Sequence, residues 1–382
     1  MTGSFGIAAT SGKKASLLHP AIVAFPASLP PSRPCIFRRV SPALETLLLP
    51  FSRGEIVVPD RALFLGAEAH PELKEWKSVT GRQPHFALAE AWRRAGHTLV
   101  EEPSGKWPVV LLLPGKSKDE ALSAFARGYD LLEDGGTLAV AMGNLAGAAR
   151  FEKELATAAG GIASIQKNKC RVFHAVKTSH WDQSLLAEWR KLGEPRVVED
   201  TGYIVEAGVF SADHVDPGSA LLATHLPKNL KGTAADLGAG WGFLSCSLLE
   251  GSPNLKGVHL FEADSRALAC ARKNLAAFDA PVEFHWHDVA AGIPGKYEII
   301  VMNPPFHTGQ ATDISLGRAF LRHAAESLRT GGRLFMVANR QLPYEAELDS
   351  LGLVWKKPVE DNTYKLLFAE KRLGASKPVA FR

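Results

Sequence analysis

The order of expected strands and helices in the second half of the chain constrains its fold most. Apolar stretches typical of strands occur at residues 234–237, 258–261, 282–285, 298–302 and 333–337. Helical patterns fall between them, at 243–249, 265–278 and 314–328. Strands and helices that alternate in this way form a mostly parallel sheet with helices on both faces. Two further strands are expected at 355–357 and 364–369, with Asp361 and Asn362 in the turn between them.

The first half of the chain repeats three segments of the second half in the same order. Residues 62–68 align with 234–240, 109–114 with 299–304, and 132–140 with 328–336. Three matches in one order predict two similar α/β domains. In the first copy the polar and glycine positions have changed: Phe64 replaces Asp236, Glu68 replaces Gly240, and Leu113 replaces Asn303. We therefore expect the first domain to be degenerate and non-catalytic.

Length and composition agree with two globular domains. The chain has 382 residues, 46% of them apolar and 22% charged, and a net charge of +4. We expect domains at 45–195 and 196–382, because Gly193 and Pro195 interrupt a helical pattern near 191–200. Residues 1–44 contain no Asp or Glu and five basic residues. We interpret them as a disordered extension, with an organelle transit peptide as the alternative.

The cysteines and the apolar stretches exclude several classes of protein. The four cysteines, which form no CxxC pair, are Cys35, Cys170, Cys246 and Cys270. A disulfide framework and a structural metal site are therefore not expected, and a reducing compartment, the cytoplasm, is. No stretch approaches the roughly 18–20 apolar residues that span a bilayer. We predict a protein without metal or membrane contact, and a monomer.

A glycine-rich loop follows the strand at 234–237 and precedes the next helix. It contains Asp236, Gly238, Gly240 and Gly242. Glycines let the backbone approach a ligand, and the helix N-terminus offers free N–H groups. The third glycine stands one residue earlier than in the dinucleotide-binding fingerprint. An acid ahead of the loop would also repel a pyrophosphate, so a cationic or zwitterionic ligand fits better.

Two acidic residues follow the next two strands. Glu262 ends the strand at 258–261, and its carboxylate can accept both hydroxyls of a ribose, with Asp264 as the second choice. Asp288 follows the strand at 282–285 and can bind an adenine amino group. Ligands of open α/β sheets bind at such strand ends. Together with the glycine loop, these residues resemble the nucleoside-binding loops of class I S-adenosylmethionine-dependent methyltransferases. The resemblance implies a Rossmann-like fold and S-adenosyl-L-methionine as cofactor.

A stiff loop with the sequence Asn303-Pro304-Pro305-Phe306 follows the strand at 298–302. Two successive prolines cannot continue a strand or a helix, so Asn303 is held in a fixed pose. Its amide oxygen and the carbonyl of Pro304 can accept both protons of a planar amino group. These two hydrogen bonds steer the nitrogen of the amino group toward a tetrahedral, nucleophilic geometry. Phe306 can stack on a single-stranded or flipped-out base.

The continuation of this loop narrows the resemblance. His307 and Gly309 extend it to the NPPFHxG pattern of bacterial ribosomal RNA guanine-N2 methyltransferases of the RsmC and RlmG type. Segments with Asp216, Gly218 and Ser219, with Asn339, Leu342 and Tyr344, and with Tyr364 and Lys365 also resemble that family. The resemblance covers about residues 45–382 and implies a degenerate first methyltransferase domain. It implies methylation of guanine N2 in ribosomal RNA or a ribosomal subunit, with 16S favoured over 23S.

The sequence leaves other functions open. The same tetrapeptide occurs in adenine-N6 and protein-glutamine methyltransferases, and a non-catalytic RNA-binding assembly factor would keep the fold without the chemistry. Substrate contacts are expected from Pro305, His307 and Arg318. Further phosphate contacts could come from Arg322 on the same helix and from basic residues of the first domain: Lys116, Lys118, Lys167, Lys169 and Arg171.

Overall fold

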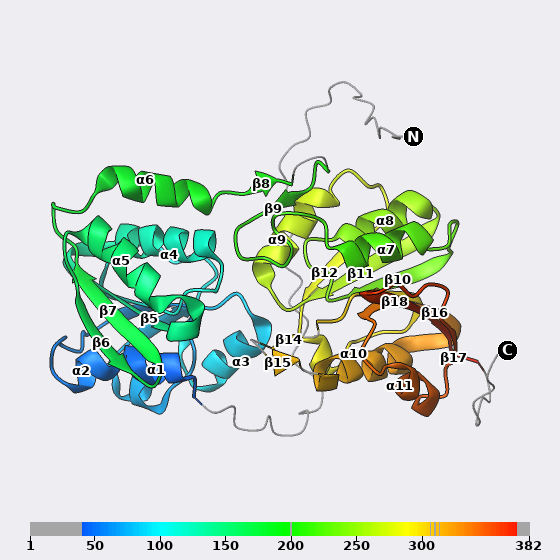
Figure 1. The fold of residues 1–382 in the computed structure, drawn as a ribbon, viewed down its shortest axis with the longest axis horizontal. Helices are drawn as coiled ribbons and strands as arrows, with labels where there is room; N and C mark the ends of the chain where they lie inside the picture. The colour runs from blue at the N-terminus through cyan, green and yellow to red at the C-terminus, as the bar shows by residue number, and fades with distance from the viewer. Residues whose placement is uncertain (1–39, 199–200, 306, 309–310, 313, 373–382) are drawn as a thin grey trace. The chain divides into compact units, whose positions relative to one another are not determined.

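The computed structural model describes residues 40–198, 201–305, 307–308, 311–312 and 314–372, and its two halves each build one seven-stranded sheet (Figure 1). The strands of the first sheet are β1 (Ala62–Leu65), β2 (Val79–Arg82), β3 (Thr98–Leu99), β4 (Trp107–Leu112), β5 (Leu132–Gly143), β6 (Ala163–Lys167) and β7 (Cys170–Val176). The helices of this half are α1 (Pro42–Leu47), α2 (Leu49–Ser52), η1 (Pro71–Glu75), α3 (Phe86–Arg94), α4 (Lys118–Leu131), η2 (Asn144–Ala146), α5 (Ala148–Ala159) and α6 (Gln183–Leu192).

The second half follows a short hairpin formed by β8 (Arg196–Val197) and β9 (Ile204–Val205). Its sheet contains β10 (Gly232–Leu237), β11 (Leu255–Glu262), β12 (Val282–Trp286), β13 (Tyr297–Met302), β16 (Leu328–Asn339), β17 (Val354–Lys356) and β18 (Tyr364–Glu370). A separate small hairpin joins β14 (His307–Thr308) and β15 (Ala311–Thr312). The helices are α7 (Pro217–His225), α8 (Phe243–Gly251), α9 (Ser265–Asn274), η3 (Val289–Ala291), α10 (Ile314–Ser327) and α11 (Glu345–Ser350).

The two sheets have the same strand order. The first runs β3-β2-β1-β4-β5-β7-β6 and the second β12-β11-β10-β13-β16-β18-β17. In both, all pairings are parallel except the last two, which are antiparallel, so β7 and β18 each run against the other strands of their sheet. This confirms the predicted α/β class with two similar units.

The register of the strand pairs is also similar in the two sheets. Ala62 of β1 pairs with Val109 of β4, as Ala234 of β10 pairs with Ile299 of β13. The pairing of β4 with β5 shifts between Trp107 and Val109, and the pairing of β13 with β16 shifts between Tyr297 and Ile299. The three segment matches read from the sequence therefore fall on equivalent strands.

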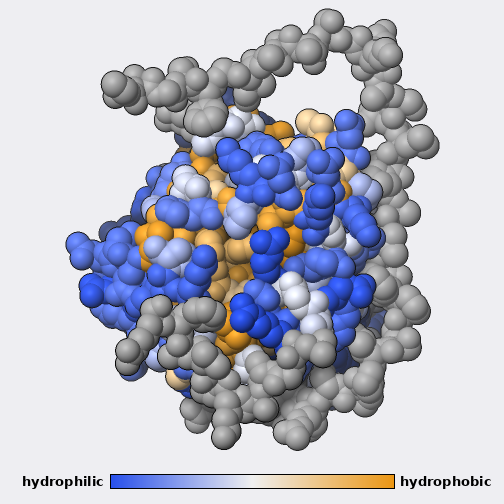
Figure 2. All heavy atoms as spheres, turned by 90° about the vertical axis from the view of Figure 1, so that its right-hand side faces the viewer, coloured by the Kyte–Doolittle hydropathy of each residue, from blue (hydrophilic) through white to orange (hydrophobic). Residues whose placement is uncertain are grey.

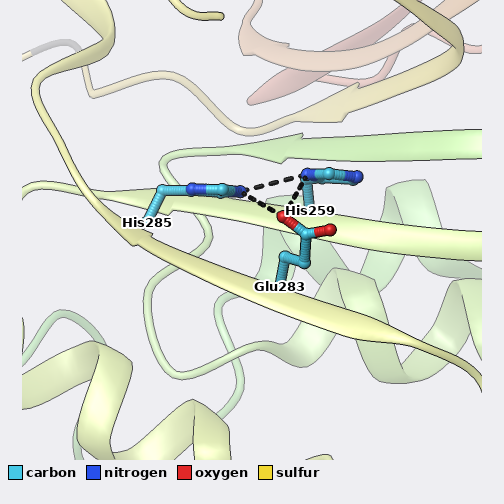
Figure 3. Close-up of side chains that lie close together, drawn as sticks. All are labelled: His259, Glu283 and His285. Atoms are coloured by element: carbon cyan, nitrogen blue, oxygen red, sulfur yellow. Dashed lines mark hydrogen bonds and ion pairs between the residues drawn. The ribbon is translucent and has the colours of Figure 1, made fainter. Parts of the chain in front are cut away.

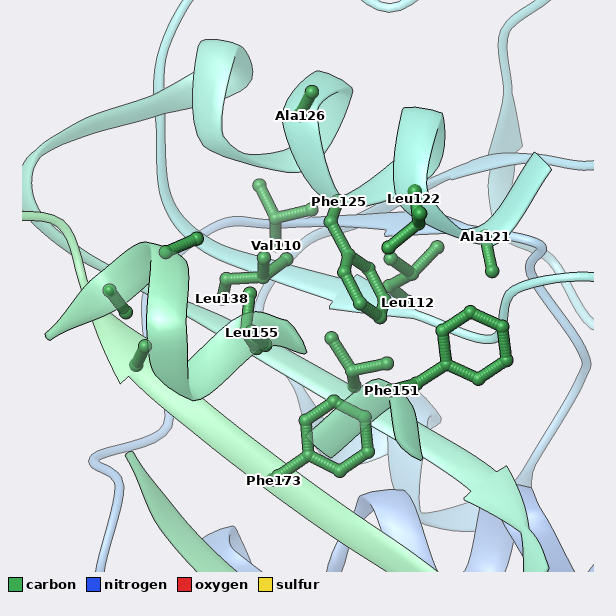
Figure 4. Packing of buried hydrophobic residues seen from close by; sticks show 14 of the residues in the cluster. Val110, Leu112, Ala121, Leu122, Phe125, Ala126, Leu138, Phe151, Leu155 and Phe173 are labelled. Carbon is green, nitrogen blue, oxygen red and sulfur yellow. The ribbon is translucent and has the colours of Figure 1, made fainter. Parts of the chain in front are cut away.

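Each half has its own apolar core. In the first half, Phe125 of α4, Phe151 of α5 and Phe173 of β7 meet edge to face beside the sheet (Figure 4). In the second half, Phe320 and Leu321 of α10 cover one face of the sheet. Burial of such side chains contributes about 1.5–3 kcal/mol each, so the first half remains a packed domain after losing its polar positions.

Two loops at equivalent positions join the halves. The backbone N–H of Phe86 donates to the carbonyl of Ala263 (2.8 Å), and the N–H of Ser265 donates to the carbonyl of Pro84 (3.0 Å). Glu120 on α4 also pairs with Arg266 on α9 (2.5 Å). These contacts anchor the segment after β11, and Glu262 is the last residue of that strand.

Some predicted boundaries differ from the structure. α1 begins at Pro42, ahead of the expected domain start at residue 45, because the Ser41 side chain accepts the N–H of Leu44 and Leu44 is buried. α9 ends at Asn274 and not at residue 278, because the Asn274 side chain bonds the backbone of Ile204 and of Trp241. The predicted linker at 191–200 begins in α6 and continues into β8, and its last two residues lie outside the described part.

One face of the surface carries both polar and apolar residues. Figure 2 shows one side of the molecule, where hydrophilic residues surround a band of apolar ones. In the part of the chain that the structure describes, we find no helix with the length and apolar character needed to cross a membrane. Residues 1–39 lie outside that part, so the interpretation of the acid-free segment stays a prediction.

Candidate active site

The predicted site residues follow adjacent strands. β11, β10 and β13 are neighbours in the second sheet and are parallel. Their carboxyl ends therefore meet at one edge of the sheet. This arrangement places Glu262, the glycine loop and Asn303 side by side, as expected for a ligand site in an open α/β sheet.

The glycine loop turns sharply after β10. Gly238 has a φ of +73° and Gly240 a φ of +54°, a left-handed conformation that favours glycine. A Cβ atom at Gly240 would meet nothing within 4 Å, so the loop borders open space there. Gly242 differs: a Cβ atom would lie 3.1 Å from Leu275 and 3.2 Å from Ala271. Gly242 thus allows α8 to pack closely against α9, and its cofactor contact stays a prediction.

Asp236 is fully buried beneath the loop. Its Oδ2 accepts the hydroxyl of Ser245 (2.7 Å). Among the described residues, no donor lies within hydrogen-bonding distance of its Oδ1. Burial raises the pKa of Asp236 to about 7, because a charged carboxylate loses its hydration there. An orphaned buried carboxylate oxygen of this kind fits a site that receives a donor or a positive charge from a ligand.

Glu262 reaches from the end of β11 to the glycine loop. Its Oε2 accepts the N–H of Gly240 (2.8 Å), and its Oε1 accepts the N–H of Asp264 (2.8 Å). Burial raises the pKa of Glu262, and the two backbone donors oppose that shift. Asp264, the second choice for a ribose contact, caps α9 and pairs with Arg266 (2.7 Å) instead. Of the two acids, Glu262 is the one at the loop.

Asp288 lies on the next strand end. It caps η3, and its Oδ1 accepts the N–H of Ala290 (2.9 Å). The backbone N–H of His287 donates to the carbonyl of Glu262 (2.9 Å). The structure thus brings the segment of Asp288 next to that of Glu262.

The side chain of Asn303 is oriented by two residues of α7. Its Nδ2 donates to Oδ2 of Asp216 (2.8 Å) and to Oγ of Ser219 (2.9 Å). Asp216 also caps α7 by accepting the N–H of Ser219 (2.7 Å). Because both amide protons are engaged, Oδ1 is the atom of Asn303 that can accept a proton from a substrate. Sequence reasoning assigned no role to Asp216 or Ser219.

A small pocket lies between these elements. It is lined by Phe210, Ser211, Asp216, Ser219, Gly238, Ala239, Gly240, Trp241, Phe243, Leu244 and Asn303. Phe210 is 63% exposed at its rim, so it is not a core residue. The buried indole of Trp241 donates from Nε1 to the carbonyl of Phe210 (3.2 Å). The glycine loop and the segment ahead of α7 therefore line one pocket and are hydrogen-bonded to each other.

The structure brings the other predicted site residues together only in part. Pro304 is buried and Pro305 is exposed beside Asn303. Phe306 and Gly309 lie outside the described residues, and only the backbone of His307, in β14, is described. Arg318 lies on α10, where its Nε pairs with Glu347 of α11 (3.6 Å).

The pocket lining, together with two acids next to the glycine loop, fits a zwitterionic nucleoside. The loop offers open space at Gly240, Glu262 offers carboxylate oxygens, and Asp236 holds an orphaned oxygen. Residues 201–367 match the family described as "Methyltransferase small domain". The α/β fold, the glycine loop and this match together define a methyltransferase.

Comparisons with individual proteins refine the class. The chain is 33% identical over 325 residues to the ribosomal RNA small subunit methyltransferase C of Yersinia enterocolitica, covering 81% of this chain and 90% of the relative. It is 29% identical over 265 residues to the protein of the same name from Psychromonas ingrahamii, covering 69% and 75%. The chain belongs to the ribosomal RNA small subunit methyltransferase C family.

A solved structure agrees with this assignment. It is the 16S rRNA N2 guanosine methyltransferase (RsmC) of T. thermophilus, in complex with AdoMet and guanosine. The TM-score is 0.71 at 26% sequence identity, and the match covers 87% of this chain and 92% of that chain. Both halves of the chain therefore take part in the likeness, as the sequence repeat predicts.

Proposed function

We propose that this protein transfers a methyl group from S-adenosyl-L-methionine to the exocyclic N2 amine of a guanine in 16S ribosomal RNA. The observation that carries the proposal is the fixed amide of Asn303. Its two donor contacts to Asp216 and Ser219 leave Oδ1 as the acceptor beside the glycine-loop pocket. Family membership and the AdoMet and guanosine complex of the T. thermophilus protein support the same cofactor and base.

The cofactor would be held by the residues that border the pocket. Glu262 would accept the ribose hydroxyls and Asp288 the adenine amino group, while the backbone of Gly238 and Gly240 would lie along the ligand. The buried carboxylate of Asp236 would balance the positive charge of the ligand. When bound, the cofactor supplies a methyl group on a sulfonium sulfur.

The chemistry needs orientation more than acid–base catalysis. The N2 amine of guanine shares its lone pair with the ring and is a weak nucleophile. Oδ1 of Asn303 and the carbonyl of Pro304 would accept its two protons and hold the nitrogen so that its lone pair faces the methyl group. The C–N bond forms as the C–S bond breaks, and the nitrogen then releases one proton to solvent. Phe306 would stack on the flipped-out base.

The two halves would have different functions. We assign catalysis to residues 196–382 and a structural or RNA-binding role to residues 45–195. The hairpin β8–β9 begins at Arg196, which supports a division there. Pro305, His307 and Arg318 would contact the RNA near the target base. Such a substrate places the enzyme in the cytoplasm with the ribosomal subunits, where we expect it to act as a monomer.

Identification of the methylated product tests the proposal. Purified protein and radiolabelled S-adenosylmethionine would be incubated with both ribosomal subunits and free ribosomal RNAs from cells that lack the gene. The products would be digested to nucleosides and separated. We expect label in N2-methylguanosine from the small subunit or its RNA. Label in N6-methyladenosine or in protein would replace the proposed reaction, and no label with bound cofactor would favour a non-catalytic assembly factor.

A further inference from the structure

A cluster of two histidines and a glutamate lies in the second sheet, away from the pocket lining. His259 belongs to β11, and Glu283 and His285 belong to the neighbouring edge strand β12. His259 is paired with Glu283 in the register of the two strands, and His285 follows two residues later on the same face. Figure 3 shows the two imidazole rings pointing toward each other with the carboxylate of Glu283 beside them.

The three polar atoms converge on one point. Nδ1 of His259 lies 3.0 Å from Nε2 of His285. Oε2 of Glu283 lies 3.4 Å from the first nitrogen and 3.7 Å from the second. A tetrahedral zinc ion with bonds of about 2.0–2.2 Å separates its ligand atoms by roughly 3.3–3.6 Å. The distance of 3.4 Å falls in this range, and the distances of 3.0 Å and 3.7 Å lie just outside it on either side, so the three atoms are close to three corners of such a site.

The burial of the three side chains is graded, so the cluster is sheltered on one side and open on the other. The side chain of His285 is 9% exposed and that of His259 22% exposed. The side chain of Glu283 is 58% exposed, which gives an ion and a water access to the cluster.

We propose that His259, His285 and Glu283 bind a divalent transition-metal ion such as Zn²⁺, with its fourth position open to water. The ion would cross-link β11 to the edge strand β12. These strands lead to Glu262 and Asp288, so the ion would stabilise this side of the sheet without touching the methyl transfer. Two imidazoles and a carboxylate are among the common zinc ligand sets. The earlier expectation of no metal rested on cysteine spacing, which does not bear on a histidine site.

Zinc titration of the full chain tests the site. The protein would be purified without a polyhistidine tag, freed of metal with a chelator, and titrated with Zn²⁺ in competition with a chromophoric chelator. We expect one equivalent per chain and a higher melting temperature with zinc, because a ligand that binds the folded state stabilises it. His259→Ala should weaken zinc binding by more than the roughly 10- to 100-fold that loss of an outer-shell partner costs.

Two further variants keep the test decisive. Glu283→Gln changes an exposed side chain and should fold normally, yet it should also weaken binding. His323→Ala is the matched control. His323 lies 3.0 Å from Glu326, and among the described residues this pair belongs to no group of three possible metal ligands. Cobalt in place of zinc should give the visible absorption of a tetrahedral site. The proposal would be overturned if zinc binding to the wild type did not saturate at one equivalent, or if all three variants bound zinc equally well.

Discussion

Gln83 and Glu262 occupy the same position in two sheets that share one strand order, yet they make different contacts. Each directly follows the residue whose carbonyl accepts the N–H of the turning glycine: Arg82 accepts from Gly66 in one half, and Phe261 accepts from Gly238 in the other. Nε2 of Gln83 donates to the carbonyl of Ala67 (2.9 Å) and closes its own loop. Glu262 instead accepts two backbone N–H groups, those of Gly240 and Asp264.

The space beside the turning glycine also differs between the two halves, and it is more open in the second half. A Cβ atom at Gly66 would lie 2.3 Å from the carbonyl oxygen of Leu113, so the backbone of the first half fills this position. The nearest neighbours of a Cβ atom at Gly238 would be the ring of Phe320 at 3.3 Å and Pro305 at 4.0 Å. Leu113 aligns with Asn303. The first half thus has an apolar side chain in place of the acceptor, and its backbone closes over the glycine.

The N-terminal helices of the halves extend the comparison. α1 packs against β5 as α7 packs against the equivalent β16. Ser41 caps α1 and Asp216 caps α7, each through the N–H three residues on. The cap survives in both halves because each helix needs it. The second function of Asp216, orienting Asn303, has no counterpart. The comparison teaches that apolar residues and turns preserve the fold, while a few polar side chains carry the site.

The largest expected effect concerns Asp236, whose position holds Phe64 in the first half. Its folded pKa of about 7 exceeds the usual 3.8, so protonation stabilises the folded state. This contribution is complete below about pH 4 and is lost as the pH rises through 7. Relative to Asp236→Asn, the free energy of unfolding of the wild type should fall across this window by at most on the order of 4 kcal/mol.

Denaturant unfolding at several pH values checks this dependence. The exposed Asp60, which pairs with Lys77, provides the control variant Asp60→Asn. It should leave the pH dependence as in the wild type. Parallel curves for the wild type and Asp236→Asn would contradict the raised pKa.

Asn303→Ala should give the second-largest effect. It removes the amide from the catalytic loop, as in the first half, where the aligned residue is Leu113. Loss of a fixed polar group at the reacting atoms costs about 10²- to 10³-fold in kcat, or roughly 3–4 kcal/mol. The dissociation constant for the cofactor should stay within about twofold. Methyl-transfer kinetics and calorimetry separate the two quantities. Asn254→Ala, in an exposed turn, is the control, and full activity of Asn303→Ala would refute its catalytic role.

Asp216→Ser should give a smaller effect, because it copies Ser41. Serine preserves the cap of α7 but holds the Asn303 amide less firmly. We expect kcat to fall about tenfold, near 1.4 kcal/mol, with little change in KM. Asp216→Asn, which keeps a side-chain oxygen at the same distance, should recover part of the rate. A fall in stability with unchanged kcat would show that Asp216 serves only the helix.

Much of this molecule could be predicted from its sequence. The strands, their alternation with helices and the three repeated segments depend on local apolar patterns, and they are confirmed. The network around Asn303 was not predicted, because Asp216 lies 87 residues away in the chain and its local pattern indicates only a helix cap. The cluster of His259, Glu283 and His285 depends on the register between two strands, which no local pattern specifies.

Cofactor binding by calorimetry tests most directly the claim that only one of the two sheets carries a site. The wild type should bind one equivalent of S-adenosylmethionine per chain. Glu262→Gln copies Gln83 and should weaken binding by about 10- to 100-fold, because charge-assisted hydrogen bonds contribute about 1.5–3 kcal/mol. The reverse change, Gln83→Glu, should leave stoichiometry and affinity unchanged. Two equivalents per chain, or loss of binding in Gln83→Glu with normal binding in Glu262→Gln, would contradict the account.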